Sequence, residues 1–185
     1  MCHALRLCLI LTLTVATGCS AVKVSQDYDA SSEFSAFSTY AWALDKQPET
    51  GDIRVDNPLL EARIRDAVDR NLSAKGYRKV NRDTADLLVA YNLTIRSRIE
   101  SDSVSSGVGY GGYPYWGGVG FETRIREYDE GMLVIDIGSA DPNKLLWRGT
   151  GTRRVTEHKN PEKSTQVVNK TVAEIMSQFP PQQMK

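Results

Sequence analysis

The chain has 185 residues, of which 41% are hydrophobic and 25% are charged, and 23 basic and 23 acidic side chains give it a formal net charge of zero. This length and composition suit one globular domain with a substantial core. The balanced charge excludes the overall electrostatic attraction by which proteins bind polyanionic nucleic acid, so we expect no nucleic-acid partner.

The amino-terminal segment has the pattern of a signal peptide. An apolar stretch from Leu7 to Val15 follows the charged residue Arg6 and ends in Ala16-Thr17-Gly18, directly before Cys19. The stretch is too short to span a bilayer, which takes about 20 residues, and suits the hydrophobic region of a signal. Small residues followed by cysteine resemble the cleavage site of a bacterial lipoprotein. We therefore predict removal of residues 1–18 and lipidation of Cys19.

Ordinary signal cleavage is the alternative, because Ala16-Thr17-Gly18 also fits a small-x-small site and because Ala16 stands where most lipoproteins have leucine. The cysteines favour lipidation. Cys2 and Cys8 lie within the predicted signal, which leaves Cys19 without a disulfide partner in the mature chain. An unpaired cysteine at the first residue of a secreted domain is unusual unless it is modified.

The predicted anchor also indicates a place for the domain. Ser20 follows the cysteine, and resemblance to enterobacterial sorting rules then implies the outer membrane, with the domain facing the periplasm. Residues 19–21 form a very short tether before the first expected strand, so we expect the domain to work close to the bilayer. The membrane, reached through the lipid on Cys19, is the first expected partner.

Two segments have the pattern of amphipathic helices, and both begin with Asn-Pro, an N-cap followed by proline at the first helical position. The first starts at Asn57-Pro58 and ends at Gly76, as a left-handed cap would end it. The second starts at Asn160-Pro161 and stops at Pro180-Pro181. Apolar residues recur at helical spacing in both, at Leu60, Ile64, Ala67, Val68 and Leu72 and at Val168, Val172, Ile175, Met176 and Phe179.

The rest of the ordered pattern is that of strands. Strands are expected at Val22–Tyr28, Thr39–Leu44, 87–96, Phe121–Tyr128, Met132–Ile137 and Leu145–Val155. A turn near Glu130-Gly131 is expected between the fourth and fifth of these. Consecutive strands with short turns favour antiparallel pairing, so we predict an α+β domain over residues 22–181. It would have two layers, a mainly antiparallel sheet with two helices packed on one face, followed by a tail at 182–185.

Short motifs occur in order along nearly the whole mature chain. They are Asp27-Tyr28-Asp29, Phe34, Phe37, Thr39-Tyr40-Ala41-Trp42, Leu72, Lys75-Gly76-Tyr77, Ala85-Asp86-Leu87, Gly131, Leu133-Val134-Ile135-Asp136, Trp147-Arg148-Gly149 and Phe179-Pro180-Pro181. In this order they resemble a bacterial lipoprotein family known as domain-of-unknown-function family 4136. The resemblance implies an envelope lipoprotein of compact α+β fold with no established activity, and it supplies no catalytic residues. Trp42 and Trp147 are expected to be buried anchors on strands.

A glycine-rich stretch is the most unusual part of the mature chain. Seven of the fourteen residues in Gly107–Gly120 are glycine, and the stretch lies within an expected connection at about 101–120. Connections of that length are usually functional or disordered. One interpretation is a flexible arm that lays its aromatic residues on a partner, a glycan or the lipid interface. The other is a mobile loop whose aromatic residues fold back on the sheet. The aromatic residues are Tyr110, Tyr113, Tyr115 and Trp116.

Four arginines flank that connection. Arg96 and Arg98 share one face of their strand, and Arg124 and Arg126 share one face of the next. If the two strands pair, all four lie on one surface that would attract anionic lipid head groups or other anionic envelope polymers. The alternative is a mixed solvated face, since acidic residues interrupt the set.

Motifs for catalysis and metal binding are weak. Acidic residues cluster at Glu127, Asp129, Glu130 and Asp136, and paired carboxylates are the machinery of glycoside hydrolysis. His158 is the one histidine after the predicted signal and lies just before a helix, where a solvated loop residue is the simpler interpretation. We expect no metal site and no cofactor.

The sequence therefore predicts a non-enzymatic envelope lipoprotein with a binding or scaffolding role at the membrane surface. Its partners would be the membrane and, beyond it, other envelope proteins, lipid head groups or glycan. The alternative is a hydrolase that acts on cell-wall or glycan material through its carboxylates.

Overall fold

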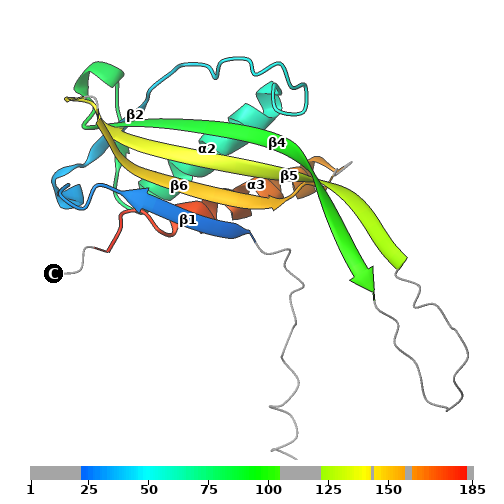
Figure 1. Cartoon of the computed structure of the whole chain (residues 1–185). Helices are drawn as coiled ribbons and strands as arrows, with labels where there is room; N and C mark the ends of the chain where they lie inside the picture. The colour runs from blue at the N-terminus through cyan, green and yellow to red at the C-terminus, as the bar shows by residue number, and fades with distance from the viewer. Residues whose placement is uncertain (1–21, 105–121, 143, 157–159, 183–185) are drawn as a thin grey trace, which may run out of the picture.

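A six-stranded sheet is the framework of the computed structural model, which describes residues 22–104, 122–142, 144–156 and 160–182 (Figure 1). Its strands are β1 (Lys23–Tyr28), β2 (Thr39–Trp42), β3 (Arg78–Lys79), β4 (Leu87–Val104), β5 (Glu122–Ser139) and β6 (Lys144–Arg154). The helices α2 (Pro58–Ala74) and α3 (Pro161–Met176) cover one face of the sheet, and short 3-10 turns lie at Phe34–Ala36 and Arg82–Thr84. This confirms the predicted two-layer α+β fold.

The strand order is β1-β6-β5-β4-β2-β3. The pairs β1–β6, β6–β5 and β5–β4 are antiparallel, whereas β2 runs parallel to both β4 and β3. The sheet is therefore mainly antiparallel, as predicted. Its parallel part consists of β2 and the short edge strand β3, which α2 connects. The sequence pattern did not indicate β3.

The two helices start as the sequence predicts and lie side by side in parallel. The Asn57 side chain accepts hydrogen bonds from the backbone N–H groups of Leu59 and Leu60 at 2.9 and 3.4 Å, and Asn160 caps α3 in the same way. Gly76 ends the first helix with a φ of 91°, a left-handed conformation that glycine adopts without strain. Contacts from Arg63 to Thr165 and from Arg70 to Asn169 align the helices, so both N-termini lie at the same end of the domain.

The core lies between the helices and the inner face of the sheet. Trp147 is fully buried and Trp42 is 9% exposed, as predicted for two anchors on strands. The Trp147 ring packs edge-on against Phe179 at 5.2 Å between centroids. Gly149 makes room for it, because a Cβ atom there would lie 2.2 Å from the Trp147 ring and 2.6 Å from Ile175.

The expected turn near Glu130-Gly131 is wrong. The chain continues as one strand, β5, from Glu122 to Ser139. Gly131 lies in the middle of the sheet, paired with Ile95 on one side and with Arg153 on the other. The local composition of this segment favours a turn, but hydrogen bonds to the strands on both sides keep it extended.

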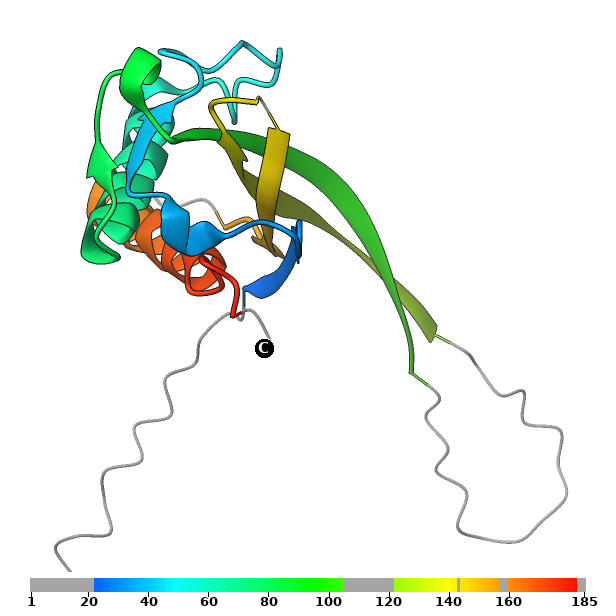
Figure 2. The same cartoon turned by 90° about the vertical axis from the view of Figure 1, so that its left-hand side faces the viewer.

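Beyond the end of β6, strands β4 and β5 continue alone as a two-stranded ribbon, residues 97–104 and 122–129. Figure 2 shows this ribbon extending well past both layers of the domain. The connection predicted at about 101–120 therefore begins later, because β4 continues to Val104 and β5 starts at Glu122. The side chains of residues 101–104 and 122–124 are not described.

Candidate functional site

A cleft of about 520 Å³ opens where both helices begin and where the ribbon leaves the domain. The cleft floor is apolar and comes from both layers. Its aliphatic residues are Leu60 and Ile64 of α2, Val167 and Val168 of α3, Leu93 and Ile95 of β4 and Leu133 of β5. Figure 2 shows the ribbon continuing past the helices, so neither α2 nor α3 covers this end of the inner face. A cleft of this size lies within the range of small-molecule sites.

Three arginines and one aspartate line the cleft among the described residues. Arg54 forms an ion pair with Asp129 at 3.0 Å, and the Arg63 Nε donates to Thr165 Oγ1 at 3.1 Å. The Arg153 guanidinium is partly buried, and this burial lowers its pKa below the ordinary value. Arg54 is also held by Asp52 at 2.8 Å. An apolar floor with guanidinium groups around it suits a ligand that has an apolar part and an anionic group.

The start of β1 borders the same cleft. Lys23 pairs with Thr152, which pairs in turn with Met132 near the base of the ribbon. A Cβ atom added at the cleft residue Gly151 would lie 3.4 Å from Val22 Cγ1. The first described residues, the cleft and the ribbon therefore share one end of the molecule.

The strand register places Arg96, Arg98 and Arg126 on one face, and Arg124 occupies a register position of the same parity, as the sequence interpretation required. Arg96 lies opposite Glu130, Arg98 opposite Tyr128, Arg126 opposite Glu100 and Arg124 opposite Asp102. This outer face is not purely basic. Arg98 Nε forms an ion pair with Glu130 at 3.1 Å, and Glu100 is paired with Arg154, whose guanidinium lies 4.0 Å from the Tyr128 ring centroid. The face is thus a mixed network that bears both charges.

The inner face of the ribbon carries two exposed isoleucines, a feature that sequence reasoning missed. Ile99 is 74% exposed and Ile125 is 70% exposed. Ile99 continues the alternation of Leu87, Val89 and Tyr91, the inward-facing core residues of β4. The two isoleucines are exposed because the helix layer does not extend over the ribbon. The alternation itself was the available signal, because it runs on past Ile95 in the sequence.

The predicted carboxylate cluster is dispersed by the strand that carries it. Strand alternation places Asp129 and Glu130 on opposite faces of the sheet. Asp129 accepts hydrogen bonds from Ser97 Oγ and from Arg54, whereas Glu130 is held by Arg98. Asp136 forms a two-pronged ion pair with Arg148, with both contacts at 2.7 Å. Glu127 shares the inner face with Asp129, so the four carboxylates are divided between the two faces of the sheet.

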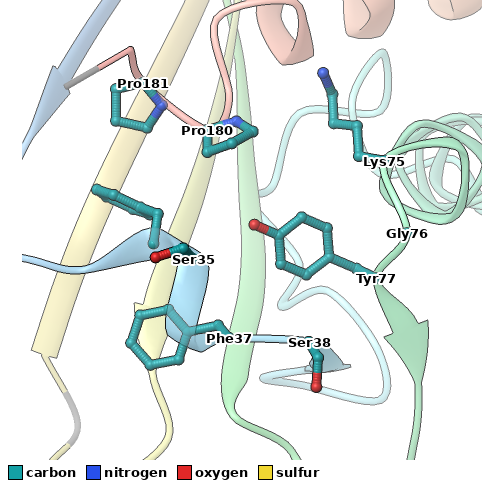
Figure 3. Close-up of a pocket in the computed structure, with 9 residues that line it drawn as sticks. Ser35, Phe37, Ser38, Lys75, Gly76, Tyr77, Pro180 and Pro181 are labelled. Carbon is teal, nitrogen blue, oxygen red and sulfur yellow. The ribbon is translucent and has the colours of Figure 1, made fainter.

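A second hollow of about 400 Å³ lies at the opposite end of the helices (Figure 3). The Tyr77 ring points into it, and burial raises the pKa of the Tyr77 hydroxyl, which keeps it neutral. Most of its lining belongs to the motifs quoted above, namely Phe34, Phe37, Lys75, Gly76, Tyr77, Pro180 and Pro181. Phe34 and Tyr77 also pack against Phe179 at 5.9 and 5.6 Å between ring centroids, so the motifs meet here to close the core.

Several predicted residues lie outside the described part of the chain, namely Cys19, Tyr110, Tyr113, Tyr115, Trp116 and His158. Among the described residues, histidine, cysteine and carboxylate side chains form no group of three that would hold a metal ion. In the same part of the chain, neither helix has the length and apolar composition needed to cross a membrane.

The family model described as a domain of unknown function (DUF4136) matches residues 24–181. The chain belongs to this family. The match confirms the family membership that the sequence motifs indicate. No curated protein matches the chain.

Solved structures are similar to this one at low sequence identity. A PDZ domain protein from Parabacteroides distasonis has a TM-score of 0.53 and 12% identity, and the match covers 88% of this chain and 36% of that one. This DUF4136 chain thus spans about a third of the length of that protein. PelC from Paraburkholderia phytofirmans, solved as a dodecamer, has a TM-score of 0.47 and 11% identity, with 85% and 96% of the two chains covered.

A putative neuraminyllactose-binding hemagglutinin homolog from Helicobacter pylori has a TM-score of 0.44 and 12% identity, with 80% and 88% of the chains covered. At these identities the likeness concerns the fold alone. The family is one of unknown function, and none of these descriptions names an enzymatic activity.

Proposed function

We propose that this DUF4136 protein is a non-enzymatic lipoprotein of the bacterial cell envelope that binds anionic, partly apolar molecules at the membrane surface. Cys19 carries the lipid and holds the domain at the periplasmic face of the outer membrane. The observation that carries this proposal is the shared position of Val22, the cleft and the ribbon at one end of the domain.

The length of the tether fixes the distance from the bilayer. Residues 19–21 separate the lipid from Val22, and three extended residues span at most about 10 Å. Because Val22 borders the cleft, the cleft and the base of the ribbon lie within about that distance of the lipid head groups. The end of the domain that carries the cleft and the ribbon, its open end, thus faces the membrane rather than the periplasm.

The lining of the cleft indicates the class of ligand. Its aliphatic floor stabilises an apolar group by removing it from water, and Arg63 and Arg153 favour an anionic group beside it. Anionic envelope lipids and their fragments have both parts. The aromatic residues between the two ribbon strands add interfacial contacts, because tyrosine and tryptophan favour the boundary between head groups and acyl chains.

The anchor is tested with Cys19→Ala. Fractionation of cells that produce this variant is expected to move the domain from the membrane fraction to the soluble fraction. Mass spectrometry of the wild-type amino terminus is expected to show an acylated Cys19. An unmodified cysteine in a membrane-bound protein would contradict this part of the proposal.

The cleft is tested with an anionic naphthalene sulfonate dye that becomes fluorescent in apolar surroundings. Val167→Trp fills the cleft, and we expect it to weaken dye binding at least tenfold. Val134→Trp is the matched control, because Val134 lies on β5 outside the cleft lining and its replacement should leave binding unchanged. Equal binding by both variants, with unchanged melting temperatures, would place the dye elsewhere and reject the cleft as the site.

A further inference from the structure

The outer edge of β4 is open over the length of the ribbon. β5 pairs with β4 from Leu87 to Val104, whereas β2, on the other side, pairs with it only from Leu87 to Val89. From Thr94 onward, no strand among the described residues lies on that side. An open edge presents unpaired backbone N–H and C=O groups and is a template for another strand.

The direction of these backbone groups follows from one hydrogen bond. The carbonyl of Val89 accepts from the backbone N–H of Ala43 at 2.8 Å, on the outer side of β4. Backbone groups alternate in direction along a strand, and the pairing of β4 with β5 continues to Val104 without a shift in register. The odd-numbered residues, Ile95, Ser97, Ile99, Ser101 and Ser103, therefore direct their N–H and C=O groups toward the open edge.

We propose that two copies of this chain pair through these edges, antiparallel and about a two-fold axis that passes through Ile99. In this register, Ile99 lies opposite Ile99 of the second copy as a hydrogen-bonded pair, the type that outward-directed backbone groups form. Arg98 lies opposite Glu100 of the second copy, and Arg96 lies opposite Asp102. Symmetry repeats each pair, so four pairs of opposite charge flank the axis.

Charge selects this register over its neighbours. Moving the axis by one residue places Arg98 opposite itself or Glu100 opposite itself. Moving it by two residues places Arg96 opposite Arg98, or Glu100 opposite Asp102. Like charges directly opposite each other destabilise a strand pair. The sequence from Arg96 to Asp102 is therefore complementary to itself in one alignment.

The same register accounts for the exposed isoleucines. Ile99 lies next to its symmetry mate on the inner face, and Ile125 lies beside Ser101, one diagonal step from Ile99. Pairing thus joins two isoleucines from each copy into one apolar patch across four strands. Side chains that are 74% and 70% exposed in one copy become partners of apolar groups. A second copy matches both the charges and this patch, which selects it over an unrelated extended peptide.

Cysteine crosslinking tests the register. The Cα atoms of a hydrogen-bonded antiparallel pair are about 5.5 Å apart, a separation that suits a disulfide. Ile99→Cys in the lipidated protein, purified in detergent, is therefore expected to form a disulfide dimer under mild oxidation. Ser97→Cys is the matched control on the same face, and its two copies lie about 14 Å apart across the axis. The wild-type protein measures any crosslinking through its own cysteine, Cys19.

A charge exchange tests the pairing independently. Arg98→Glu alone and Glu100→Arg alone each place like charges opposite each other, so each variant is expected to dimerise at least about tenfold more weakly than wild type. A mixture of the two variants restores opposite charges at every pair and should form a heterodimer. Analytical ultracentrifugation measures all three samples, and circular dichroism checks that the variants are folded.

Four results would contradict the proposed pairing of two copies. A wild-type protein that stays monomeric at high concentration would refute the pairing, as would equal crosslinking by the Ile99→Cys and Ser97→Cys variants. A dimer whose strength is unchanged by both charge variants would form through another surface, and an extended peptide that binds this edge in place of a second copy would identify a different partner. The pairing does not depend on the anchor or on the cleft, so either proposal can fail alone.

Discussion

Trp147 is the side chain around which the two layers close. It is fully buried, packs against Phe179, and its indole N–H donates to Gln26 at 2.9 Å. Trp147→Ala would leave a cavity, so we expect a loss of about 3–5 kcal/mol in the free energy of unfolding. Urea denaturation measures it. Trp116→Ala is expected to leave the midpoint unchanged, and equal losses from both variants would show that Trp116 belongs to the core.

Asp86 holds the beginning of β2 through its carboxylate. The backbone N–H groups of Ser38 and Thr39 donate to it at 2.9 Å each, and the Thr39 hydroxyl donates at 2.8 Å. These hydrogen bonds lower the pKa of Asp86 from its ordinary value of 3.8. Because the folded pKa is the lower one, this stabilisation is present above pH 3.8 and is lost as the pH falls through the folded value.

Asp86→Asn is therefore expected to lower stability near neutral pH by about 1–2 kcal/mol and to reduce the loss of stability in acid. Melting temperatures between pH 7 and pH 2 measure both effects. Asp83→Asn is the control, because Asp83 is an exposed residue in the turn just before Asp86. An acid profile of Asp86→Asn that matches wild type would show that this carboxylate does not drive the acid loss.

Among the elements, the helices were the most predictable from sequence and β5 the least. Asn57 and Asn160 act within their own chain segments, and Gly76 likewise, so local rules predicted both helix starts and one helix end. The continuity of β5 depends on β4 and β6, which lie far away in the sequence. Local composition near Gly131 therefore indicated a turn, and the neighbouring strands overrode it.

The connection between the two ribbon strands carries the third prediction. Replacing Tyr110, Tyr113, Tyr115 and Trp116 with serine is expected to spare the fold, because a stretch with seven glycines has little stabilising order to lose. The same change should weaken binding to lipid vesicles, and the loss should persist at high salt because it is apolar. Vesicle co-sedimentation measures binding, and thermal melting checks the fold.

Replacing Arg96, Arg98, Arg124 and Arg126 with glutamine serves as the comparison for that prediction. If these arginines meet anions, their loss should weaken vesicle binding at low salt and matter little at high salt. Unchanged vesicle binding after deletion of the whole connection would show that it only links the strands, and membrane contact would then belong to the cleft and the outer face of the sheet.

For the molecule as a whole, the distance from the membrane is the quantity to vary. A flexible linker of 12 Gly and Ser residues inserted between Ala21 and Val22 adds roughly 19 Å of average reach. If the open end works at the bilayer, this insertion should reduce capture of membrane-embedded anionic lipid while stability stays unchanged. The same linker added after Pro181 is the control. Equal capture by both proteins would show that proximity is not required.

The arrangement of the whole molecule was predictable only in part. Two layers and a mainly antiparallel sheet followed from the order of the elements. The cleft did not, because its lining comes from positions as far apart as Arg54 and Thr171. The cleft exists because the helix layer does not extend as far as the ribbon does. This is a relation between elements that no single segment of the sequence contains.

The ribbon also gives the molecule a length that can change without disturbing the core. Residues 97–104 of β4 and 122–129 of β5 lie beyond the domain and pair only with each other. Because side chains alternate with a period of two, adding or removing two residues in each strand keeps every face unchanged and alters the length by about 7 Å. The reach of this ribbon can therefore be adjusted in steps of one residue pair per face, separately from the stability of the core.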